Sequence, residues 1–409
     1  MTGQLQLVAV SYQKNTLIIV EGKPPIDRFF IIREGKVRLS REIEVVVEEG
    51  GNILGPGDTF GVVSAMSSHN CLETAQALTN LVLISVKKDQ YSDLIRQNTP
   101  VAMKIIRQFS RRLRFLDDAL SRQNTNHEMQ EDASRLLFNS GEYYTKARRF
   151  NHAYFAYKQY VKNYPQGEHF AKIKDRLLKI ALKVNPKPPE KSKNNDMELT
   201  YPADSMIFAE GEPGDCLFII RKGSVKICKI VDDKEVMLAM LNPGDIFGEM
   251  ALLENKPRMA AAVAYGACTI MTVTRANFEG LISTQPQLIS RLTALLADRL
   301  WLIYKQLANT LIENPLGRIY DALQIQLEKD RIPMDTKQDY ACNFGIKELV
   351  AMAGLPPEDS DALLKRIILT KRIADVGGKL HVFDTSDVFR QAENYRRAQK
   401  STVKRTLRD

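Results

Sequence analysis

The amino-acid sequence predicts an α+β multidomain protein in which two small β-barrels of the jelly-roll type are each followed by a long helix. Three observations lead to this expectation. The chain of 409 residues is longer than a single hydrophobic core normally organises. A long motif occurs twice, about 187 residues apart, and an apolar stripe of helical period follows each copy. A repeat of this length indicates domain duplication and not a solenoid.

The two copies share an opening segment and a later landmark. The segment IFAEGEPGDCLFIIRKGSVKI at 207–227 matches LIIVEGKPPIDRFFIIREGKVRL at 17–39 after one inserted residue, and GDIFG at 244–248 matches GDTFG at 57–61. Short apolar and β-branched runs, separated by Gly, Pro and Asp at turn-like spacing, indicate antiparallel strands. We expect the first β domain with its helix over 1–123 and the second over 198–312.

Each apolar stripe has its members three or four residues apart, as one face of a helix requires. After the first copy they are Val101, Ile105, Phe109, Leu113, Leu116 and Leu120. After the second copy they are Ile289, Leu292, Leu296, Leu300, Ile303, Leu307 and Leu311. Such a stripe packs against its parent domain or forms a dimer seam, and both uses stay open.

Between the β domains, residues 128–183 have a helical pattern rich in Tyr, Phe and Lys. Its order of large, small, aromatic, small and helix-ending residues resembles the tetratricopeptide repeat. The positions that carry the resemblance are Leu137, Gly141, Tyr144, Ala153 and Pro165. Tyr157 and Tyr160 are larger than the repeat prefers. The resemblance implies a helical hairpin, which serves either as a spacer or as a docking surface for a protein partner.

The composition, with 44% hydrophobic and 26% charged residues, is that of an ordinary globular protein. The polar run NPKPPEKSKNND predicts a linker over 184–197. No run is long and apolar enough to span a bilayer and no signal peptide pattern is found, so we expect a cytoplasmic protein without membrane contact. Five scattered cysteines, with no CxxC pair, predict neither a metal site nor a disulfide framework nor an iron-sulfur cofactor.

The net charge of +9 is distributed unevenly along the chain. Residues 101–183 contain 17 Lys and Arg against 8 Asp and Glu, a surplus as large as that of the whole chain. Residues 313–389 have a balance of −3, and the last twenty residues, 390–409, have a balance of +5. Basic segments favour acidic partners. Within the C-terminal end, the tail 390–409 is therefore the part that favours such a partner.

A short turn in the second copy, FGEMALLENKPRMAAAV at 247–263, combines the residues that a cyclic phosphate diester requires. A guanidinium binds two phosphate oxygens in bidentate fashion, and backbone N–H groups at a helix start supply further donors. A carboxylate accepts the proton of a ribose 2′-hydroxyl, and a preceding Gly lets the backbone come close. Gly248, Glu249 and Arg258 supply this set within eleven residues.

This turn resembles the phosphate-binding cassette of the cyclic-nucleotide-binding domain family. The matching residues are FGE, ALL, PR, the small residues after them, Gly223 and Gly244-Asp245. The resemblance implies that Arg258 pairs with the cyclic phosphate and that Glu249 takes the ribose hydroxyl. It also implies that the amides of Gly248 and Ala260 donate to the ligand.

The identity of the base depends on Met259, the residue after the Arg. Family members that choose between cyclic AMP and cyclic GMP have a small or hydroxylated residue there. The hydroxyl that helps select guanine is absent, so cyclic AMP is favoured and a cyclic dinucleotide stays open. The helix after the barrel supplies a lid for the base in this family, and DRLWLIYKQL at 298–307 offers Trp301 and Tyr304 as candidate base contacts. Packing alone would account for these two side chains equally well.

The first copy lacks both charged residues of the turn. Val62 stands at the Glu position and Cys71 aligns with the Arg position. An anion there would meet neither a cation nor a carboxylate partner. We expect this copy to keep the fold without the ligand, so that each chain binds one nucleotide.

The C-terminal end contains an amphipathic helix pattern at 314–327, followed by the segment 346–384. In this segment a helix ends at Ala353-Gly354, Pro356-Pro357 opens another, and Gly377-Gly378 turns a short hairpin. The order resembles the winged helix-turn-helix of the cyclic-AMP receptor protein family. It implies a winged helix-turn-helix domain over 313–389 and a basic tail over 390–409.

The second of these helices lacks the basic residues that a DNA-reading helix presents. Glu358, Asp359 and Asp361 lie in its first two turns, and Pro357 and Ala362 occupy positions where arginines are expected. Cations that can still hold phosphates are Lys365, Arg366, Lys371, Arg372, Arg396, Arg397, Lys400, Lys404, Arg405 and Arg408.

Two hypotheses follow from these patterns. The first is a cyclic-nucleotide-responsive transcription regulator, a homodimer in which ligand binding at Arg258 reorients the helix 287–312 and repositions the winged helices on DNA. The second is a signalling adaptor that binds a cyclic nucleotide or dinucleotide, does not bind DNA specifically and acts through protein partners. No Ser-His-Asp, metal or Gly-rich triphosphate motif is found, so we do not expect an enzyme.

Overall fold

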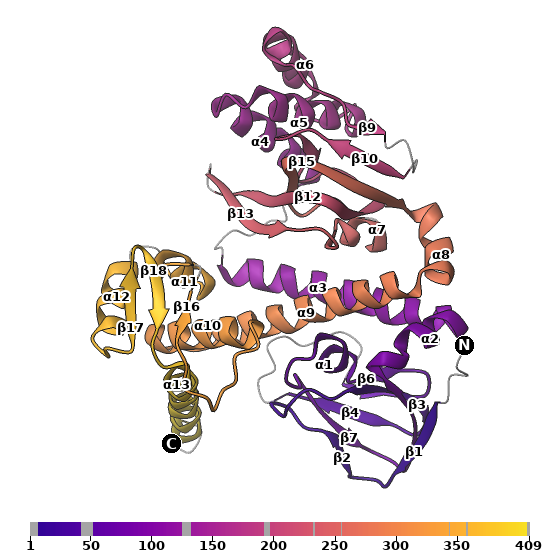
Figure 1. The fold of residues 1–409 in the computed structure, drawn as a ribbon, viewed down its shortest axis with the longest axis vertical. Helices are drawn as coiled ribbons and strands as arrows, with labels where there is room; N and C mark the ends of the chain where they lie inside the picture. The colour runs from indigo at the N-terminus through magenta and orange to yellow at the C-terminus, as the bar shows by residue number, and fades with distance from the viewer. Residues whose placement is uncertain are drawn as a thin grey trace. The chain divides into compact units, whose positions relative to one another are not determined.

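The computed structural model describes residues 7–41, 52–124, 132–191, 197–231, 234–254, 256–342, 344–356 and 359–406 (Figure 1). The chain divides into two compact units. Unit 1 contains residues 1–127 and 293–409, and unit 2 contains residues 128–292. The boundary after Leu292 falls inside the long helix α9 (Pro286–Thr310). No helix in the described ranges has both the length and the apolar character needed to cross a membrane.

Unit 1 begins with the first β region, which has two four-stranded antiparallel sheets. One sheet has the order β1 (Val8–Tyr12), β8 (Leu81–Lys87), β3 (Arg28–Glu34), β6 (Thr59–Phe60). The other has the order β2 (Leu17–Ile19), β7 (Thr74–Ala77), β4 (Val37–Ser40), β5 (Ile53–Leu54). Apolar side chains from both sheets share one core, in which Phe30 stacks on Phe60 with ring centroids 5.3 Å apart. The short helix α1 (Val62–Ser67) follows β6.

Two helices follow the first β region: α2 (Tyr91–Gln97), after the 3-10 turn Lys88–Gln90, and α3 (Thr99–Asn124). Pro100 lies in the first turn of α3, where a missing N–H breaks no intrahelical hydrogen bond. The predicted stripe lies on one helix, and its members Ile105, Phe109, Leu113 and Leu116 are buried. The long helix after the first copy is therefore confirmed.

The C-terminal part of unit 1 is a helical domain with a small sheet. Its elements are α10 (Pro315–Lys329), β16 (Tyr340–Ala341), α11 (Ile346–Met352), α12 (Ser360–Ile368), β17 (Ile373–Val376), β18 (Lys379–Val382) and α13 (Thr385–Thr406). The Asn314 side chain caps α10 by accepting from the N–H of Leu316 at 2.9 Å. Gly377 and Gly378, with φ of 62° and 81°, turn the antiparallel β17–β18 hairpin as predicted.

Unit 2 begins with three helices: α4 (Ala133–Lys146), α5 (Phe150–Asn163) and α6 (Phe170–Ile180), extended by the 3-10 turn Ala181–Lys183. Tyr157 and Tyr160, larger than the repeat pattern prefers, are both fully buried. Gly141 makes room for Tyr157, because a Cβ at Gly141 would lie 2.2 Å from its ring. The assignment of this segment to the tetratricopeptide class stays a prediction.

The second β region of unit 2 is a seven-stranded antiparallel sheet. Its main path is β13 (Lys234–Leu241), β12 (Cys216–Val231), β15 (Ala261–Thr274), β10 (Glu198–Tyr201), β9 (Glu190–Lys191). Two further strands pair outside this path, β11 (Met206–Phe208) with β15 and β14 (Ile246–Phe247) with β12. Part of the segment predicted as a linker is a strand, β9. Its residues Glu190 and Lys191 pair with Thr200 and Leu199 of β10. The helices α7 (Glu249–Glu254) and α8 (Arg275–Thr284) flank β15.

The helical segment and the second β region share one core. Tyr144 of α4 donates its hydroxyl to Glu235 of β13 at 2.9 Å, and Arg149 forms ion pairs with Glu235 at 2.8 Å and Asp204 at 2.9 Å. Burial and the neighbouring Glu235 raise the pKa of Tyr144, which keeps its hydroxyl protonated as a donor. The helical segment therefore packs onto the second β region, and its role as a spacer or a docking surface stays a prediction.

Candidate functional site

Arg258 lies in the connection between α7 and β15, at one end of the second β region. Its N–H donates to the carbonyl of Glu212 at 2.8 Å, and its own carbonyl accepts from the N–H of Gly211 at 2.8 Å. These two bonds fix the connection to the turn that precedes β12. The side chain is consequently directed inward and is only 5% exposed.

The guanidinium of Arg258 contacts neutral groups. Its Nη1 donates to the carbonyl of Gly248, and its Nη2 donates to the carbonyl of Cys216 at 2.8 Å. Its Cζ lies 4.5 Å from the ring centroid of Phe208 and 5.3 Å from that of Phe218, distances typical of cation–π contacts. Within the described residues, its buried Nε has no hydrogen-bond partner.

Two glycines let the guanidinium occupy this position. A Cβ on Gly248 would lie 2.6 Å from Nη1 of Arg258, and a Cβ on Gly214 would lie 2.5 Å from its Cζ. Gly248 also has a φ of 71°, in the left-handed region that side chains rarely adopt. The Gly before the carboxylate is therefore required for close approach, although what it approaches in this structure is Arg258.

The predicted site residues meet around Gly248. Glu249 is the first residue of α7 and is 1% exposed, and the preceding residue, Gly248, accepts from Arg258. Met259 is 39% exposed and Ala260 is half-buried, so the residue expected to influence the choice of base faces solvent. The roles assigned to these residues stay predictions.

Sequence reasoning missed Glu212, a carboxylate beside this site. Its Oε2 accepts from the N–H of Ala209 at 2.9 Å, and its carbonyl binds the N–H of Arg258. Burial raises the pKa of the Glu212 carboxyl to about 7, against the smaller opposing effects of the Ala209 bond and the Arg258 charge. The signal available in the sequence was the position of Glu212 between Gly211 and Gly214, the turn that binds Arg258.

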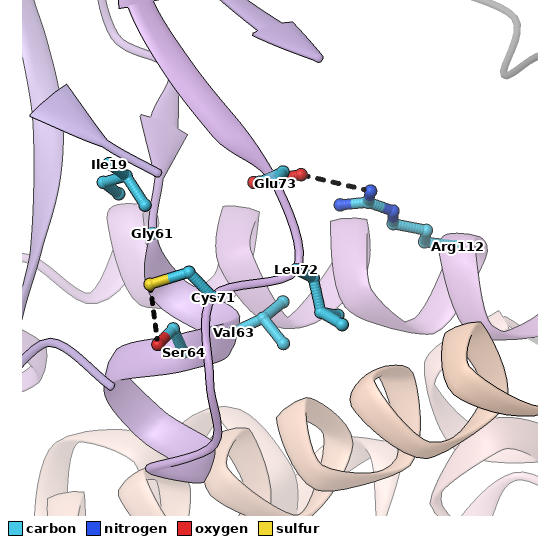
Figure 2. A pocket seen from close by; sticks show the side chains of 8 residues that line it. All are labelled: Ile19, Gly61, Val63, Ser64, Cys71, Leu72, Glu73 and Arg112. Atoms are coloured by element: carbon cyan, nitrogen blue, oxygen red, sulfur yellow. Dashed lines mark hydrogen bonds and ion pairs between the residues drawn. The ribbon is translucent and has the colours of Figure 1, made fainter. Parts of the chain in front are cut away.

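The first β region has Val62 and Cys71 at the positions that correspond to Glu249 and Arg258, and Figure 2 shows the surroundings of Cys71. Val62 is 3% exposed and Cys71 is 4% exposed, and the Cys71 thiol lies 3.5 Å from the hydroxyl of Ser64. Burial raises the pKa of this thiol, so it stays neutral. Ser64 and Cys71 line a cavity of about 10 Å³, roughly the space of one water molecule.

A carboxylate and an arginine, Glu73 and Arg112, also line this small cavity. Glu73 forms ion pairs with Arg41 at 2.9 Å and with Arg112 of α3 at 3.5 Å. Figure 2 shows Arg112 directed at Glu73 across the edge of the cavity. In the first copy, the carboxylate of Glu73 thus lies near the position that corresponds to Arg258, the predicted anion-binding residue of the second copy.

Trp301 and Tyr304 lie in the part of α9 that belongs to unit 1. Trp301 stacks on His69 with ring centroids 3.9 Å apart, and Tyr304 lies under the guanidinium of Arg112 at 4.8 Å. The contacts found for both side chains lie within unit 1, and both are buried. Their role as base contacts at Arg258 stays a prediction, and their packing role is established.

The α12 helix carries both charge signs on exposed positions. Asp361 lies in its first turn, and Lys365 and Arg366 lie in its last turn, all three exposed. Pro357 and Glu358, two positions where a DNA-reading helix would not be expected to have these residues, lie outside the described residues. The exposed cations of α12 are therefore confined to its C-terminal half.

Other cations predicted to hold phosphates are engaged within the protein. Three form ion pairs: Arg372 with Asp387 at 2.7 Å, Arg396 with Asp321, and Arg397 with Glu393. Lys371 is exposed. The side chains of Lys400, Lys404 and Arg405, and the whole of Arg408, lie outside what the structure describes.

A comparison with protein families finds the cyclic nucleotide-binding domain twice, at residues 9–98 and 198–285. The cAMP-activated global transcriptional regulator CRP of Pasteurella multocida is 30% identical over 187 residues, which are 45% of this chain and 89% of that protein. A CRP-like cAMP-activated global transcriptional regulator of Mycobacterium tuberculosis is 32% identical over 120 residues, 29% of this chain and 54% of that protein.

Among solved structures, the catabolite activator protein of Thermus thermophilus is 27% identical, with a TM-score of 0.28 over 48% of this chain and 90% of that one. The relatives named here are described as transcriptional regulators. Both β regions match the cyclic nucleotide-binding domain, as the repeated motif and the turn at 247–263 predicted. On this family match, and on the identity and coverage of its relatives, the chain belongs to the cyclic-AMP receptor protein (CRP) family.

Proposed function

We propose that this protein is a cyclic-nucleotide-responsive transcription regulator. The second β region binds one nucleotide per chain at Arg258, with cyclic AMP as the favoured ligand. Helices α8 and α9 transmit the binding event, and the elements α10 to α13 act as a winged helix-turn-helix on DNA. The description of the relatives as cAMP-activated transcriptional regulators supports this function.

The observation that carries the proposal is a buried cation whose contacts are neutral. Arg258 is 5% exposed and donates to the carbonyls of Gly248 and Cys216. Burying an ionised group is expensive unless it is well paired, and carbonyl acceptors compensate less than an anion does. A cyclic phosphate, which offers two oxygens and a negative charge, is a better partner for this guanidinium.

The ribose would be held by Glu249, one residue after the Gly248 carbonyl that accepts from Arg258. A buried carboxylate is a strong acceptor for a hydroxyl proton. The amides of Gly248 and Ala260 would donate to the phosphate. Because Met259 has no hydroxyl, the site offers no side-chain contact of the kind that helps select guanine.

A link from the site to the long helices lies within unit 2. Arg275, the first residue of α8, donates through Nη2 to the carbonyl of Leu252 in α7. Helix α8 ends at Thr284 and α9 begins at Pro286. A shift of α7 on ligand binding would therefore be carried to α8 and onward along the chain.

Calorimetry with cyclic AMP on the full chain tests this assignment. Arg258→Ala should abolish binding or weaken it by about 10- to 100-fold or more, because a charge-assisted hydrogen bond contributes roughly 1.5 to 3 kcal/mol. Lys256→Ala is the matched control, since Lys256 is an exposed cation in the same connection. Wild type and the control should each bind one nucleotide per chain. One full-affinity site remaining in Arg258→Ala would place the ligand elsewhere.

The second candidate function is a signalling adaptor that does not bind DNA specifically. Exposed Asp361 on α12 and the ion pairs of Arg372 with Asp387 and of Arg396 with Asp321 favour it, because these features reduce the cationic surface offered to DNA. Its protein partner would dock on the helical segment α4 to α6. DNA affinity with and without nucleotide separates the two functions.

A further inference from the structure

Trp301 joins α9 to the first β region at the segment that corresponds to the nucleotide turn of the second. Its indole stacks on the imidazole of His69 with centroids 3.9 Å apart and an interplanar angle of 15°. Asp298, one turn earlier on α9, lies 3.2 Å from Nε2 of His69. Trp301 is 1% exposed and His69 is 6% exposed, so the contact excludes water.

Arg331, just after α10, holds the same segment from the C-terminal side. Its guanidinium donates to the carbonyls of Ser67 and Ser68 and to Nδ1 of His69, the last at 2.9 Å. Carbonyls at a helix C-terminus carry partial negative charge and favour a cation, and Ser67 ends α1. The end of α1 therefore binds an arginine from the chain's own C-terminal part.

A second group of contacts joins the middle of α9 to the edge of the small cavity. Two guanidiniums lie near the ring of Tyr304, with Cζ of Arg41 4.6 Å and Cζ of Arg112 4.8 Å from the ring centroid. Glu73 pairs with both arginines, which balances part of their charge. Further toward the start of α9, Thr293 and Tyr91 share a hydrogen bond between their hydroxyls at 3.1 Å.

We propose that the first β region is an intramolecular partner for α9 and for Arg331 after α10. It covers, within one chain, the face of α9 that a second copy would otherwise have to cover. Its nucleotide turn has lost the ligand-binding residues and has become a dock for Trp301 and Arg331. The protein is then a monomer with a single DNA-binding unit, in place of the homodimer that the apolar stripe also allowed. The DNA-binding part of this statement rests on the proposed function, whereas the docking does not.

Light scattering of the full chain during size-exclusion chromatography tests the oligomeric state. We expect the mass of a monomer, near 46.3 kDa, at every protein concentration, with and without cyclic AMP. A concentration-independent mass of twice that value would overturn the proposal, because a second copy would then supply the partner surface.

Trp301 is the single tryptophan of the chain, so its fluorescence reports on the dock alone. Arg331→Gln should raise the acrylamide quenching constant by about twofold or more, because loss of the Arg331 bonds loosens the cover over the indole. Lys329→Gln, at an exposed position on the last residue of α10, is the matched control and should leave quenching unchanged. Asp298→Asn, a milder change at a half-exposed side chain, should shift quenching in the same direction by less.

Unchanged quenching in both Arg331→Gln and Asp298→Asn would overturn the dock. Neither measurement requires nucleotide or DNA. A failure here is therefore distinguishable from a failure of nucleotide binding at Arg258, which calorimetry reports separately.

Discussion

Arg258 and Glu249 are both ionisable and both buried, at 5% and 1% exposure. Arg258 donates to the carbonyl of Gly248, and Glu249 is the next residue. We therefore expect a nucleotide that displaced this contact to meet both side chains. In the first copy the same two positions, Val62 and Cys71, are apolar or neutral and equally buried. At these two positions the copies therefore differ in charge and not in burial.

Glu249→Gln tests the ribose contact through the ligand. The variant should lose about tenfold in affinity for cyclic AMP, because a hydrogen bond to a charged acceptor contributes about 1.5 kcal/mol or more. For 2′-deoxy cyclic AMP the variant and wild type should bind alike, since that ligand lacks the hydroxyl. Calorimetry with both ligands gives the comparison, and an equal loss for the two would mean that Glu249 acts on the fold of the turn.

Glu212 predicts a pH dependence of unit 2. Its folded pKa of about 7 lies above the ordinary value of 4.5, so the folded state holds a proton that the unfolded state has released between these two values. Stability from this group is thus present below about pH 4.5 and is lost as pH rises through 7, by up to about 3 kcal/mol. Amide hydrogen exchange in β12 and β15 should show Glu212→Gln better protected than wild type at pH 8 and equal to it near pH 5. Equal protection at both values would contradict this.

At the scale of elements, the packing of α4 on α5 depends on a glycine. Gly141 lies in the buried face of α4, and a Cβ there would come within 2.2 Å of the Tyr157 ring. Tyr157 is in turn fixed by its hydroxyl bond to Glu142 at 2.5 Å, and Arg176 of α6 pairs with Glu142 at 3.0 Å. The Tyr157 ring therefore has little freedom to move aside, because contacts from α4 and α6 hold it in place.

Gly141→Ala should therefore destabilise α4 and α5 by about 1 to 3 kcal/mol, the usual effect of overpacking a core. Gly280→Ala is the matched control, because Gly280 is also helical and has open space around its Cα. That control should stabilise α8 by about 0.5 to 1 kcal/mol through the better helix propensity of Ala. Hydrogen exchange of peptides from α4, α5 and α8 measures both, and full protection of α4 in Gly141→Ala would refute the close packing.

The elements that the sequence predicted well are those with a local or repeated signal. The apolar stripe around Ile105 and Leu113 has a helical period, Gly377-Gly378 has turn chemistry, and the second copy repeats the pattern of the first. Strand β9 was missed because Glu190 and Lys191 are polar, and their pairing with β10 comes from the sheet and not from their own propensity.

The residues of the candidate site also fall into two groups, those with a local sequence signal and those without one. Gly248, Glu249 and Arg258 lie within eleven residues and could be grouped by spacing alone. Glu212 and Phe208, which also contact Arg258 or its backbone, lie some 40 to 50 residues away in sequence and are joined to it by strand pairing. The contact of Trp301 with His69 spans an even longer separation, and a helical stripe does not say which domain covers it.

For the whole molecule, we propose that the two copies of the duplicated β region have different tasks. The second keeps a buried cation and carboxylate, which suit a nucleotide. The first has a cavity of only about 10 Å³, and its His69 stacks on Trp301 of α9 and bonds to Arg331 after α10. One region would sense the ligand, and the other would hold the helices that lead to the C-terminal domain.

The central claim is that nucleotide binding at Arg258 controls binding to DNA. The direct measurement is the affinity of the full chain for DNA sites selected from a random library with cyclic AMP present, determined against salt concentration with competitor DNA. We expect cyclic AMP to raise specific affinity by about tenfold or more in wild type and in Lys256→Ala, and to have no effect in Arg258→Ala. Binding that is weak, steeply dependent on salt and indifferent to nucleotide in all three proteins would contradict the account and favour the adaptor.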